Sequence, residues 1–323
     1  MASNGNGEIM VFAGTAGQAL KSEICSLLRI DEAPCLLQRF GDGEIELQLK
    51  KNVRGTDVFI INPTSPSADN MLEMVLLAKA ARGASARRVT IIPTYLGYNR
   101  QERKDRSRVA ISAKVFIDML KVSGADRALL FDLHSEATAA HFEPMVTDHL
   151  YGSYVGVPHM KKLLTKKFVV ASPDAGGTAR ARKYAEYLGS EDLVIFDKKR
   201  KKPGVVAENS IRLIGDVRGK DVVLVDDIID SGGTMINDAG LAKKKGAKRI
   251  FAFATHGIFS KGLGVFPPGL IEEIAITNSI PQDLVRLRSN NVRVTVLSVA
   301  PLFADAIRRL NEEKSLSELI LQS

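Results

Sequence analysis

Short apolar runs alternate with longer segments of helical periodicity along the chain. The runs are rich in Val, Ile and Leu and apolar at nearly every position, which is typical of strands buried on both faces of a parallel sheet. We expect strands at Ile9–Ala13, Val58–Ile61, Val89–Ile92, Ala128–Asp132, Phe168–Ala171, Val222–Val225, Ile250–Ala254 and Val294–Leu297. We expect helices at Met71–Arg82, Ala113–Val122, Ala179–Leu188, Met235–Lys245 and Leu302–Glu312. This alternation predicts an α/β fold in which helices flank mostly parallel sheets.

The sequence contains one structural unit twice. The run Val53–Val58 (VRGTDV) recurs as Val217–Val222 (VRGKDV), 164 positions further along. Downstream, Gly83–Val89 parallels Gly246–Ile250 at a shift of 163 positions. Two matches nearly in register are improbable by chance, and each copy reads strand, loop, helix, glycine turn, strand. We therefore predict two similar domains, residues 1–152 and residues 153–323.

The two copies differ directly after their shared strand. The second copy continues with Asp226 and Asp227 and then with the small-residue loop Asp230–Thr234, where the first copy has Asn62–Pro66. Ligands of open α/β sheets bind at the carboxyl ends of the strands. The chemistry is therefore expected on the second copy.

The acidic pair and the loop suit a sugar phosphate. Glycines at the start of a helix let several backbone N–H groups converge on one anion, and the hydroxyls of Ser231 and Thr234 add donors. We expect Gly233 to sit where a side chain would crowd the anion or where φ is positive. The carboxylates can accept hydrogen bonds from ribose hydroxyls. A simple helix cap at Asp230 or Ser231 would explain those two residues, but not the acidic pair or the double glycine.

Composition limits the class of protein and the compartment in which it is expected. A length of 323 residues with 45% hydrophobic and 25% charged residues suits a globular protein of two domains. No apolar run approaches the roughly 20 residues that cross a membrane, and the leading MASNGNGE lacks the apolar core of a signal peptide. Cys25 and Cys35 have no metal-like spacing. We expect a cytoplasmic protein that binds no membrane.

The net charge of +8 is concentrated in local clusters, at Arg100–Arg108, Lys198–Lys202 and Lys243–Lys245. Any one cluster can be a solvated face. Nucleic acid is not the expected partner, because tryptophan is absent and no aromatics interleave with the basic runs. Phosphorylated metabolites are the alternative partners of such charge. The run at Lys198–Lys202 could also be an import or RNA patch, but its place after the strand-like Leu193–Phe196 favours a cationic lid.

The segment Val222–Thr234 resembles, nearly residue for residue, the phosphoribosyl-diphosphate signature of type I phosphoribosyltransferases and related synthases. Further stretches resemble the ribose-phosphate diphosphokinase family, in the same order along the chain: Phe40–Glu44, Pro93–Arg108, Phe131–His134, Ser172–Gly177, Asp197–Pro203, Thr255–Ser260 and Ser315–Ser317. The resemblance implies two type I phosphoribosyltransferase-like domains. It also implies that ATP and ribose 5-phosphate are converted to 5-phosphoribosyl 1-diphosphate and AMP, which feeds nucleotide biosynthesis.

The resemblance also implies a role for individual residues. Ribose 5-phosphate is expected at Arg200, Asp226, Asp227, Asp230, Ser231, Gly232, Gly233 and Thr234. ATP is expected at Phe40, Asp42, Gly43, Glu44, Arg100 and Gln101, with the loop from Phe40 to Glu44 reaching the nucleotide of a neighbouring subunit. Magnesium is expected at His134 and Asp174, with Asp132 and Asp148 as second-rank candidates. Lys198 and Arg200 are the expected catalytic residues, on a mobile loop. The family's assembly implies homo-oligomers in which dimers build a hexamer.

Elementary chemistry agrees with these roles. An arginine such as Arg100 can stack on adenine and also bind phosphate. Magnesium keeps few protein ligands and bridges phosphate oxygens, so one His and one Asp can suffice. Taken alone, His134 would more often be a satisfied strand-end histidine, and Phe40–Glu44 an ordinary turn. We expect His141, His149, His159 and His256 to be structural or surface residues.

The chain departs from the family pattern at a few positions. Asn99 stands where alanine is usual and Glu102 where aspartate is usual, and Lys261–Gly264 lacks the usual Gly-Pro-Ala.

Two other functions share parts of this pattern. A phosphoribosyltransferase would consume the same diphosphate, but the segment at Arg100 and the duplicated domain argue against it. A catalytically silent regulatory homologue would have no reason to keep the Lys198 loop and the acidic pair.

Overall fold

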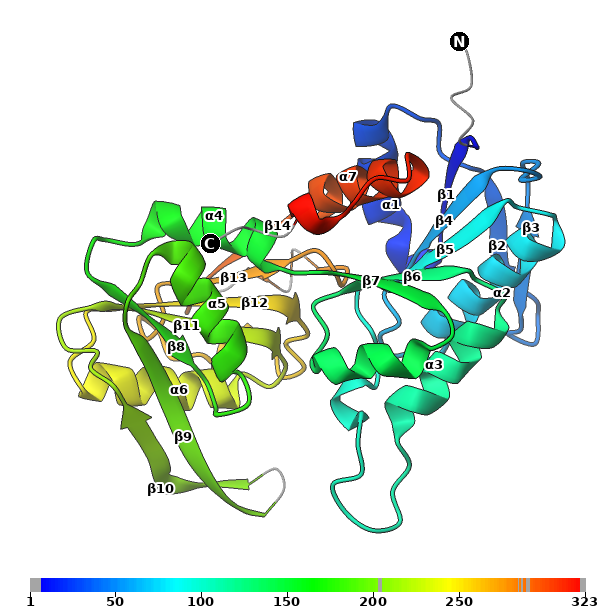
Figure 1. The fold of residues 1–323 in the computed structure, drawn as a ribbon. Helices are drawn as coiled ribbons and strands as arrows, with labels where there is room; N and C mark the ends of the chain where they lie inside the picture. Colours follow the sequence, from blue (N-terminus) through cyan, green and yellow to red (C-terminus); the bar gives the residue numbers. More distant parts are fainter. Residues whose placement is uncertain (1–6, 203–204, 284, 286, 289–290, 320–323) are drawn as a thin grey trace. The chain divides into compact units, whose positions relative to one another are not determined.

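The chain folds into two units, each built on a mostly parallel sheet, as the computed structural model shows (Figure 1). The structure describes residues 7–202, 205–283, 285, 287–288 and 291–319, and from 198 to 210 it describes the backbone alone. The first unit comprises Met1–Tyr151, Ser279–Pro281 and Val299–Ile320, and the second comprises Gly152–Asn278, Gln282–Ser298 and Leu321–Ser323. The predicted domain of residues 153–323 therefore needs correction, because its last helix, α7 (Ala300–Asn311), belongs to the first unit.

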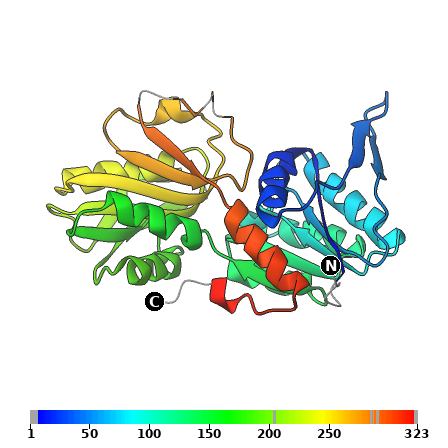
Figure 2. The same cartoon turned by 90° about the horizontal axis from the view of Figure 1, so that it is seen from above.

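The first unit has a five-stranded parallel sheet in the order β1-β4-β5-β6-β7. Its strands are β1 (Ile9–Ala13), β4 (Asp57–Ile61), β5 (Arg88–Ile92), β6 (Arg127–Phe131) and β7 (Val146–Leu150). The helices α2 (Asp69–Gly83) and α3 (Ser112–Val122) cover the face that carries Phe12, Ile60 and Ile91. Helices α1 (Gln18–Leu28) and α7 lie side by side in Figures 1 and 2. Phe303 of α7 packs against Phe131, whose strand position faces away from α2 and α3, so α7 completes the core of this unit.

The second unit has a seven-stranded sheet in the order β10-β9-β8-β11-β12-β13-β14. Its strands are β8 (Phe168–Ser172), β9 (Leu193–Lys202), β10 (Val205–Ile214), β11 (Asp221–Ile229), β12 (Arg249–Gly257), β13 (Glu273–Thr277) and β14 (Arg293–Leu297). Helix α6 (Gly233–Lys244) covers the face with Val222 and Leu224, whereas α4 (Ser153–Leu163) and α5 (Thr178–Leu188) cover the face with Val223 and Val225. Successive residues of β11 thus enter two different cores, which explains its unbroken apolar run.

All the predicted strands and helices are confirmed, with ends that differ by a few residues. Two antiparallel pairs were not predicted. One is the hairpin of β2 (Cys35–Arg39) and β3 (Ile45–Leu49). In the other, β10 pairs with β9, so the basic run from 198 to 202 continues a strand where a loop was expected. Short 3₁₀ helices complete the elements: η1 (Thr15–Gly17), η2 (Asn99–Gln101), η3 (Glu136–Phe142), η4 (Leu263–Val265) and η5 (Ser317–Leu319).

The sequence repeat has the same backbone bonding in both units. The N–H of Gly55 donates to the carbonyl of Ser85 at 3.0 Å, and the N–H of Gly219 donates to that of Gly246 at 2.8 Å. Both glycines have a positive φ, of 74° and 70°. The strands that follow, β4 and β11, both lie inside a run of parallel strands, β4 between β1 and β5 and β11 between β8 and β12. The predicted duplication is therefore a duplication of structure.

A buried aspartate opens the repeated strand in each unit. Asp57 is bonded by Arg87 and Arg88, and Asp221 by Arg249, the first residue of the neighbouring strand. Burial alone would raise the pKa of Asp57, but hydrogen bonds from Arg87, Arg88 and Asn311 outweigh it and hold the pKa below its ordinary value. Asn311 lies at the end of α7, so this carboxylate also ties the last helix to the first sheet.

We predict that Asp57→Asn lowers the free energy of unfolding by about 1.5–3 kcal/mol, because it removes the buried charge to which the half-exposed Arg87 and Arg88 and the buried Asn311 donate. Folding lowers the pKa of Asp57, so its contribution is complete above the ordinary carboxyl pKa and is lost as the pH falls through the folded-state pKa. Chemical denaturation across the acid range should show the gap between parent and variant closing towards low pH. Asp118→Asn, which removes an exposed partner of Lys114 and Lys121, should cost less than about 1 kcal/mol. Equal losses in both variants would contradict the prediction.

Candidate active site

Two carboxylates lie next to each other near the carboxyl end of β11. This strand runs on to Ile229, beyond the predicted end at Val225, so Asp226 and Asp227 are part of the strand itself. Asp227 is 4% exposed, and its Oδ1 accepts a hydrogen bond from Arg180 Nη1 at 3.1 Å. The backbone N–H of Asp227 donates to Asp226 Oδ1 at 2.9 Å. The pair is therefore held by one arginine from α5 and one backbone donor.

The pKa of Asp226 is well above its ordinary value. Burial is the main cause, followed by the negative charge of Asp227, while Arg180 acts in the opposite direction. Two acids this close favour a shared proton, so that one carboxyl group can donate a hydrogen bond while the other accepts one. Such a pair can hold two neighbouring hydroxyls of a sugar.

The loop after β11 turns sharply into α6. Gly232 has a φ of 77°, and a Cβ there would lie 2.7 Å from Phe266 Cζ. Gly233 is the first residue of α6, and a Cβ there would meet only Ser231 Oγ, at 3.7 Å. The positive φ belongs to Gly232, so that alternative is wrong for Gly233, because the left-handed residue precedes the helical ones. The other alternative, that a side chain at Gly233 would crowd a bound anion, stays a prediction.

The start of α6 offers the donors that the sequence predicted. The first N–H groups of a helix have no acceptor within it, and the helix dipole favours an anion there. Ser231, Gly233 and Thr234 are exposed at this end. The segment after β12 supports the loop from behind, since the N–H of Ser260 donates to the carbonyl of Asp230 at 3.2 Å. The loop and the helix start thus form a backbone cradle whose exposed end can receive an anion.

The loop after β8 ends at the same edge of the sheet, because β8 is parallel to β11 and pairs Ala171 with Leu224. Asp174 lies in this loop, and its Oδ1 accepts a hydrogen bond from the N–H of Gly177 at 2.9 Å. Its side chain is only partly buried. Helix α5 starts at Thr178 and carries Arg180 back to the acidic pair. A hard carboxylate oxygen at this place suits a divalent cation.

In the first unit, Arg100 and Gln101 form the turn η2 after β5. Both side chains are exposed, and Gln101 Oε1 accepts a hydrogen bond from Ser112 Oγ at 2.7 Å. The preceding Asn99 is buried. His134 is exposed and follows β6, the strand parallel to β5, so both segments lie at the carboxyl edge of the first sheet.

The predicted segment Phe40–Glu44 is the tip of the β2–β3 hairpin. The N–H of Phe40 donates to the carbonyl of Glu44, and the N–H of Glu44 donates to Asp42 Oδ1. The Phe40 side chain is 51% exposed. Next to the tip, Arg39 at the end of β2 forms ion pairs with Asp69 and with the buried Glu73. The tip thus exposes an aromatic ring to solvent, and the ion pairs of Arg39 hold the tip in place.

The two predicted catalytic residues fall outside the described side chains. The backbones of Lys198 and Arg200 belong to β9, opposite Ile211 and Val206 of β10. Their roles stay predictions.

The sequence matches known families over most of its length. Residues 9–124 match the N-terminal domain of ribose phosphate pyrophosphokinase, and residues 190–321 match the phosphoribosyl synthetase-associated domain. The ribose-phosphate pyrophosphokinase of Prochlorococcus marinus (strain MED4) is 40% identical over 323 residues, which cover 97% of this chain and 94% of that protein. The one of Wolinella succinogenes is 41% identical over 313 residues, covering 96% of this chain and 98% of that protein.

The chain belongs to the ribose-phosphate pyrophosphokinase family.

A solved structure agrees with this assignment. The crystal structure of phosphoribosylpyrophosphate synthetase from Mycobacterium smegmatis is similar with a TM-score of 0.85 and 32% identity, covering 95% of this chain and 99% of that chain. The predicted α/β fold with two domains is thereby confirmed, as is the predicted resemblance to the family.

Arg180 is a site residue that sequence reasoning missed. It lies 47 positions before Asp227, and only the pairing of β8 with β11 brings α5 to the acidic pair. The available signal was the Gly176-Gly177 turn, which places an arginine in the first turn of the following helix. The Arg180 cation offsets the negative charge of Asp227 at this place.

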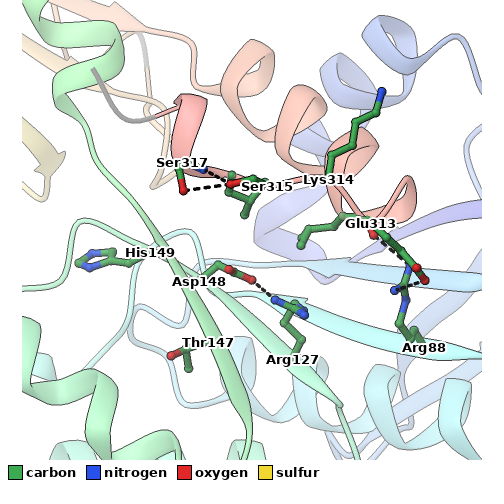
Figure 3. A pocket seen from close by; sticks show the side chains of 11 residues that line it. Arg88, Arg127, Thr147, Asp148, His149, Glu313, Lys314, Ser315 and Ser317 are labelled. Atoms are coloured by element: carbon green, nitrogen blue, oxygen red, sulfur yellow. Dashed lines mark hydrogen bonds and ion pairs between the residues drawn. The ribbon is translucent and has the colours of Figure 1, made fainter. Parts of the chain in front are cut away.

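A hollow of about 610 Å³ lies elsewhere in the first unit, where β5 and β6 begin (Figure 3). Figure 3 shows Arg127 directed at Asp148, to which it is bonded, and Ser315 and Ser317 above them. Asp148, a second-rank metal candidate, is therefore engaged by an arginine at the amino ends of these strands. The family-like stretch Ser315–Ser317 lines the same hollow, away from Arg100 and His134.

The remaining candidates have structural contacts. Asp132 is buried, with a positive φ of 42°. His149 Nε2 accepts from the N–H of Leu133, and His159 Nε2 lies 2.6 Å from Glu273 Oε1.

Among the described residues, no group of three or more His, Cys, Asp or Glu could hold a metal ion by itself. Nor does that part of the chain contain a helix long and apolar enough to cross a membrane.

We predict that Gly232→Ala destabilises the second unit by about 1–2 kcal/mol or more, because alanine disfavours a left-handed φ and its Cβ would press on Phe266. Gly233→Ala adds the same atom in open space and should change the free energy of unfolding by less than about 1 kcal/mol. Denaturant unfolding of both variants separates the two positions. A larger loss at Gly233 would contradict the assigned geometry.

We predict that Asp226→Asn raises the melting temperature near neutral pH. Folding raises the pKa of Asp226, so the stability of the parent is complete below the ordinary carboxyl pKa and declines as the pH rises towards the folded-state pKa. Asparagine removes that cost, and each kcal/mol regained appears as about 2–4 °C. Thermal melts from acid to neutral pH should show the gap between variant and parent opening with pH. The exposed Glu191→Gln should show no such trend, and an Asp226→Asn protein less stable than the parent at neutral pH would refute the assignment.

Proposed function

We propose that this chain transfers the diphosphoryl group of ATP to the 1-hydroxyl of ribose 5-phosphate, giving 5-phosphoribosyl 1-diphosphate and AMP. The observation that carries the proposal is the acidic pair of Asp226 and the buried Asp227 beside the exposed backbone donors at the start of α6. Full-length relatives named ribose-phosphate pyrophosphokinase support it.

The second unit provides the acceptor site. The cradle from Asp230 to Thr234 binds the 5-phosphate through backbone N–H groups and the hydroxyls of Ser231 and Thr234. Asp226 and Asp227 hold the ring hydroxyls, and Arg180 fixes the orientation of Asp227. The sugar is thereby held at both ends, which leaves its 1-hydroxyl as the group that reacts.

The reaction itself needs little covalent chemistry from the protein. The oxygen of the 1-hydroxyl forms a bond to the β-phosphorus of ATP, and the bond from that phosphorus to the oxygen bridging the α- and β-phosphates breaks. AMP leaves with the bridging oxygen, and the proton of the hydroxyl is released. Catalysis therefore consists mainly of positioning and of neutralising charge.

The first unit provides the nucleotide site. Arg100 stacks on adenine or binds a phosphate. Because Gln101 Oε1 accepts from Ser112, the amide N–H₂ of Gln101 is the group left to donate to the nucleotide. Phe40, Asp42, Gly43 and Glu44 at the hairpin tip complete the nucleotide site of a neighbouring subunit. The exposure of Phe40 supports this role.

Membership of a diphosphokinase family implies a divalent metal. We infer that the metal is magnesium and that His134 and Asp174 hold it. Magnesium would neutralise charge on the triphosphate, and its preference for water and phosphate ligands fits a site with few protein donors. Asp174 supplies a partly exposed carboxylate for this purpose.

Several further properties belong to the same proposal. Lys198 and Arg200 close over the triphosphate and stabilise charge in the transition state, and Arg200 also contacts ribose 5-phosphate. The chains form dimers that assemble into a hexamer, in the cytoplasm. Cys25 and Cys35 are both free thiols, which supports a reducing compartment.

The test is formation of AMP from ATP and ribose 5-phosphate with a divalent metal, measured by a coupled assay. A phosphoribosyltransferase would instead consume 5-phosphoribosyl 1-diphosphate together with a base, and a silent homologue would do neither. No AMP from correctly folded protein would reject the proposal.

We predict that Lys198→Ala and Arg200→Ala lower kcat at least about 100-fold while changing the ATP dissociation constant little, because they act on the transition state. Lys244→Ala, which removes an exposed cation at the end of α6, is the matched control and should keep full activity. Losses of equal size in turnover and in nucleotide affinity would contradict the catalytic assignment.

A further inference from the structure

A buried hydrogen bond joins two loops of the first unit that leave neighbouring parallel strands. Thr138 Oγ1 donates to Asn99 Oδ1 at 2.8 Å. Thr138 has no exposed surface and Asn99 is 6% exposed. Asn99 is the first residue of η2, directly before Arg100, and Thr138 lies in η3, four positions after His134. The bond therefore links the turn assigned to the nucleotide with the segment assigned to the metal.

This bond is buried, whereas the hydrogen bond of Gln101 with Ser112 is exposed and the contact of His141 Nε2 with the carbonyl of Glu102, at 3.3 Å, is only partly buried. Water can substitute more readily for a contact that it can reach. A buried acceptor that loses its donor keeps the full cost of its desolvation.

The backbone before the turn needs this fixation. Tyr98 has a positive φ of 59°, an uncommon conformation for a residue other than glycine. Its ring packs on Phe116 of α3, with centroids 3.8 Å apart. One side of the turn thus rests on α3 through Tyr98, and the other side rests on η3 through Asn99. Loss of either support lets the strained residue relax and moves Arg100.

We propose that Asn99 is a positioning residue that couples the nucleotide-binding turn at Arg100 and Gln101 to the segment that follows His134. The inference rests on the proposed function. Asn99 itself is buried, so it acts through the alignment of its neighbours. Its bond to Thr138 keeps the turn in the arrangement that accepts the nucleotide while the metal segment is in place.

The bond between Asn99 and Thr138 is expected to increase the fraction of the protein in which the turn is arranged to bind ATP. The apparent dissociation constant of a ligand equals its intrinsic value divided by the fraction of protein in the competent arrangement. If breaking the bond reduces that fraction to about one fifth, ATP binds about fivefold more weakly, with no contact to ATP removed. Binding of ribose 5-phosphate in the second unit does not depend on this fraction.

The experiment compares Asn99→Ala, Thr138→Val and the double variant with the parent, and uses Thr138→Ser as the conservative variant that keeps the hydroxyl. ATP affinity is measured by calorimetry with a divalent metal present, alongside the KM for each substrate in AMP formation. We expect each single variant to weaken ATP binding about five- to tenfold, the double variant to be no weaker than either single one, and Thr138→Ser to bind as the parent does. The KM for ribose 5-phosphate should not change.

A matched control distinguishes positioning from stability. Thr165→Val also removes a hydroxyl that donates to a buried carboxylate, Asp221 in the second unit. It should lower the melting temperature and leave ATP affinity unchanged. If Asn99→Ala and Thr138→Val behave in the same way as this control, or if their effects on ATP affinity add in the double variant, the inference is wrong. AMP formation by the parent tests the proposed function separately, because the calorimetric comparison needs no turnover.

Discussion

The arrangement of the candidate site in the second unit depends on the ion pair between Arg180 and Asp227. Asp226 and the buried Asp227 lie next to each other on β11, and Arg180 from α5 offsets their charge. That arginine can reach them only because β8 and β11 are adjacent and parallel, which brings the loop at Asp174, the pair and the α6 cradle to one edge. The raised pKa of Asp226 means that its charged form lowers the free energy of unfolding, a cost that is common at functional sites. The surrounding parallel sheet holds the acids in place against that cost.

The two units share a scaffold but differ in what they place at its carboxyl edge. Asp57 and Asp221 hold the amino ends of the equivalent strands β4 and β11 in place through their arginine partners. Where the second copy has its acids, the first has the buried Asn62, whose Nδ2 donates to the carbonyl of Asn70. Nearby, the N–H and hydroxyl of Thr15, in the loop after β1, donate to the buried Glu73. A carboxylate of the chain itself thus occupies donors that could otherwise face an anion.

The sequence pattern predicted the strands that are buried on both faces, and it missed the strands that form by antiparallel pairing at the surface. The central strands were recognisable because each residue enters one of two cores. The β2–β3 hairpin is half-exposed and its alternation is weak, and β9 ends in cations that disfavour a strand by propensity alone. The motif at Asp226–Thr234 was readable, but which glycine takes the left-handed φ depends on the residue at which α6 begins, and the contact that a side chain at Gly232 would make is with Phe266, 34 positions away. Asn99 was visible only as a departure from the family, and its partner Thr138 was not visible at all.

The return of α7 to the first unit has a consequence for how the chain is made. A ribosome releases the chain from its amino end, and domains generally fold as they emerge. The first sheet here emerges early, yet the helix that covers Phe131 and the amide that reaches Asp57 are encoded after the whole second unit. During synthesis the earlier half must therefore wait with the part of one apolar face beside α1 uncovered. The later half can close its own core first, so the amino-terminal unit is the last to be completed.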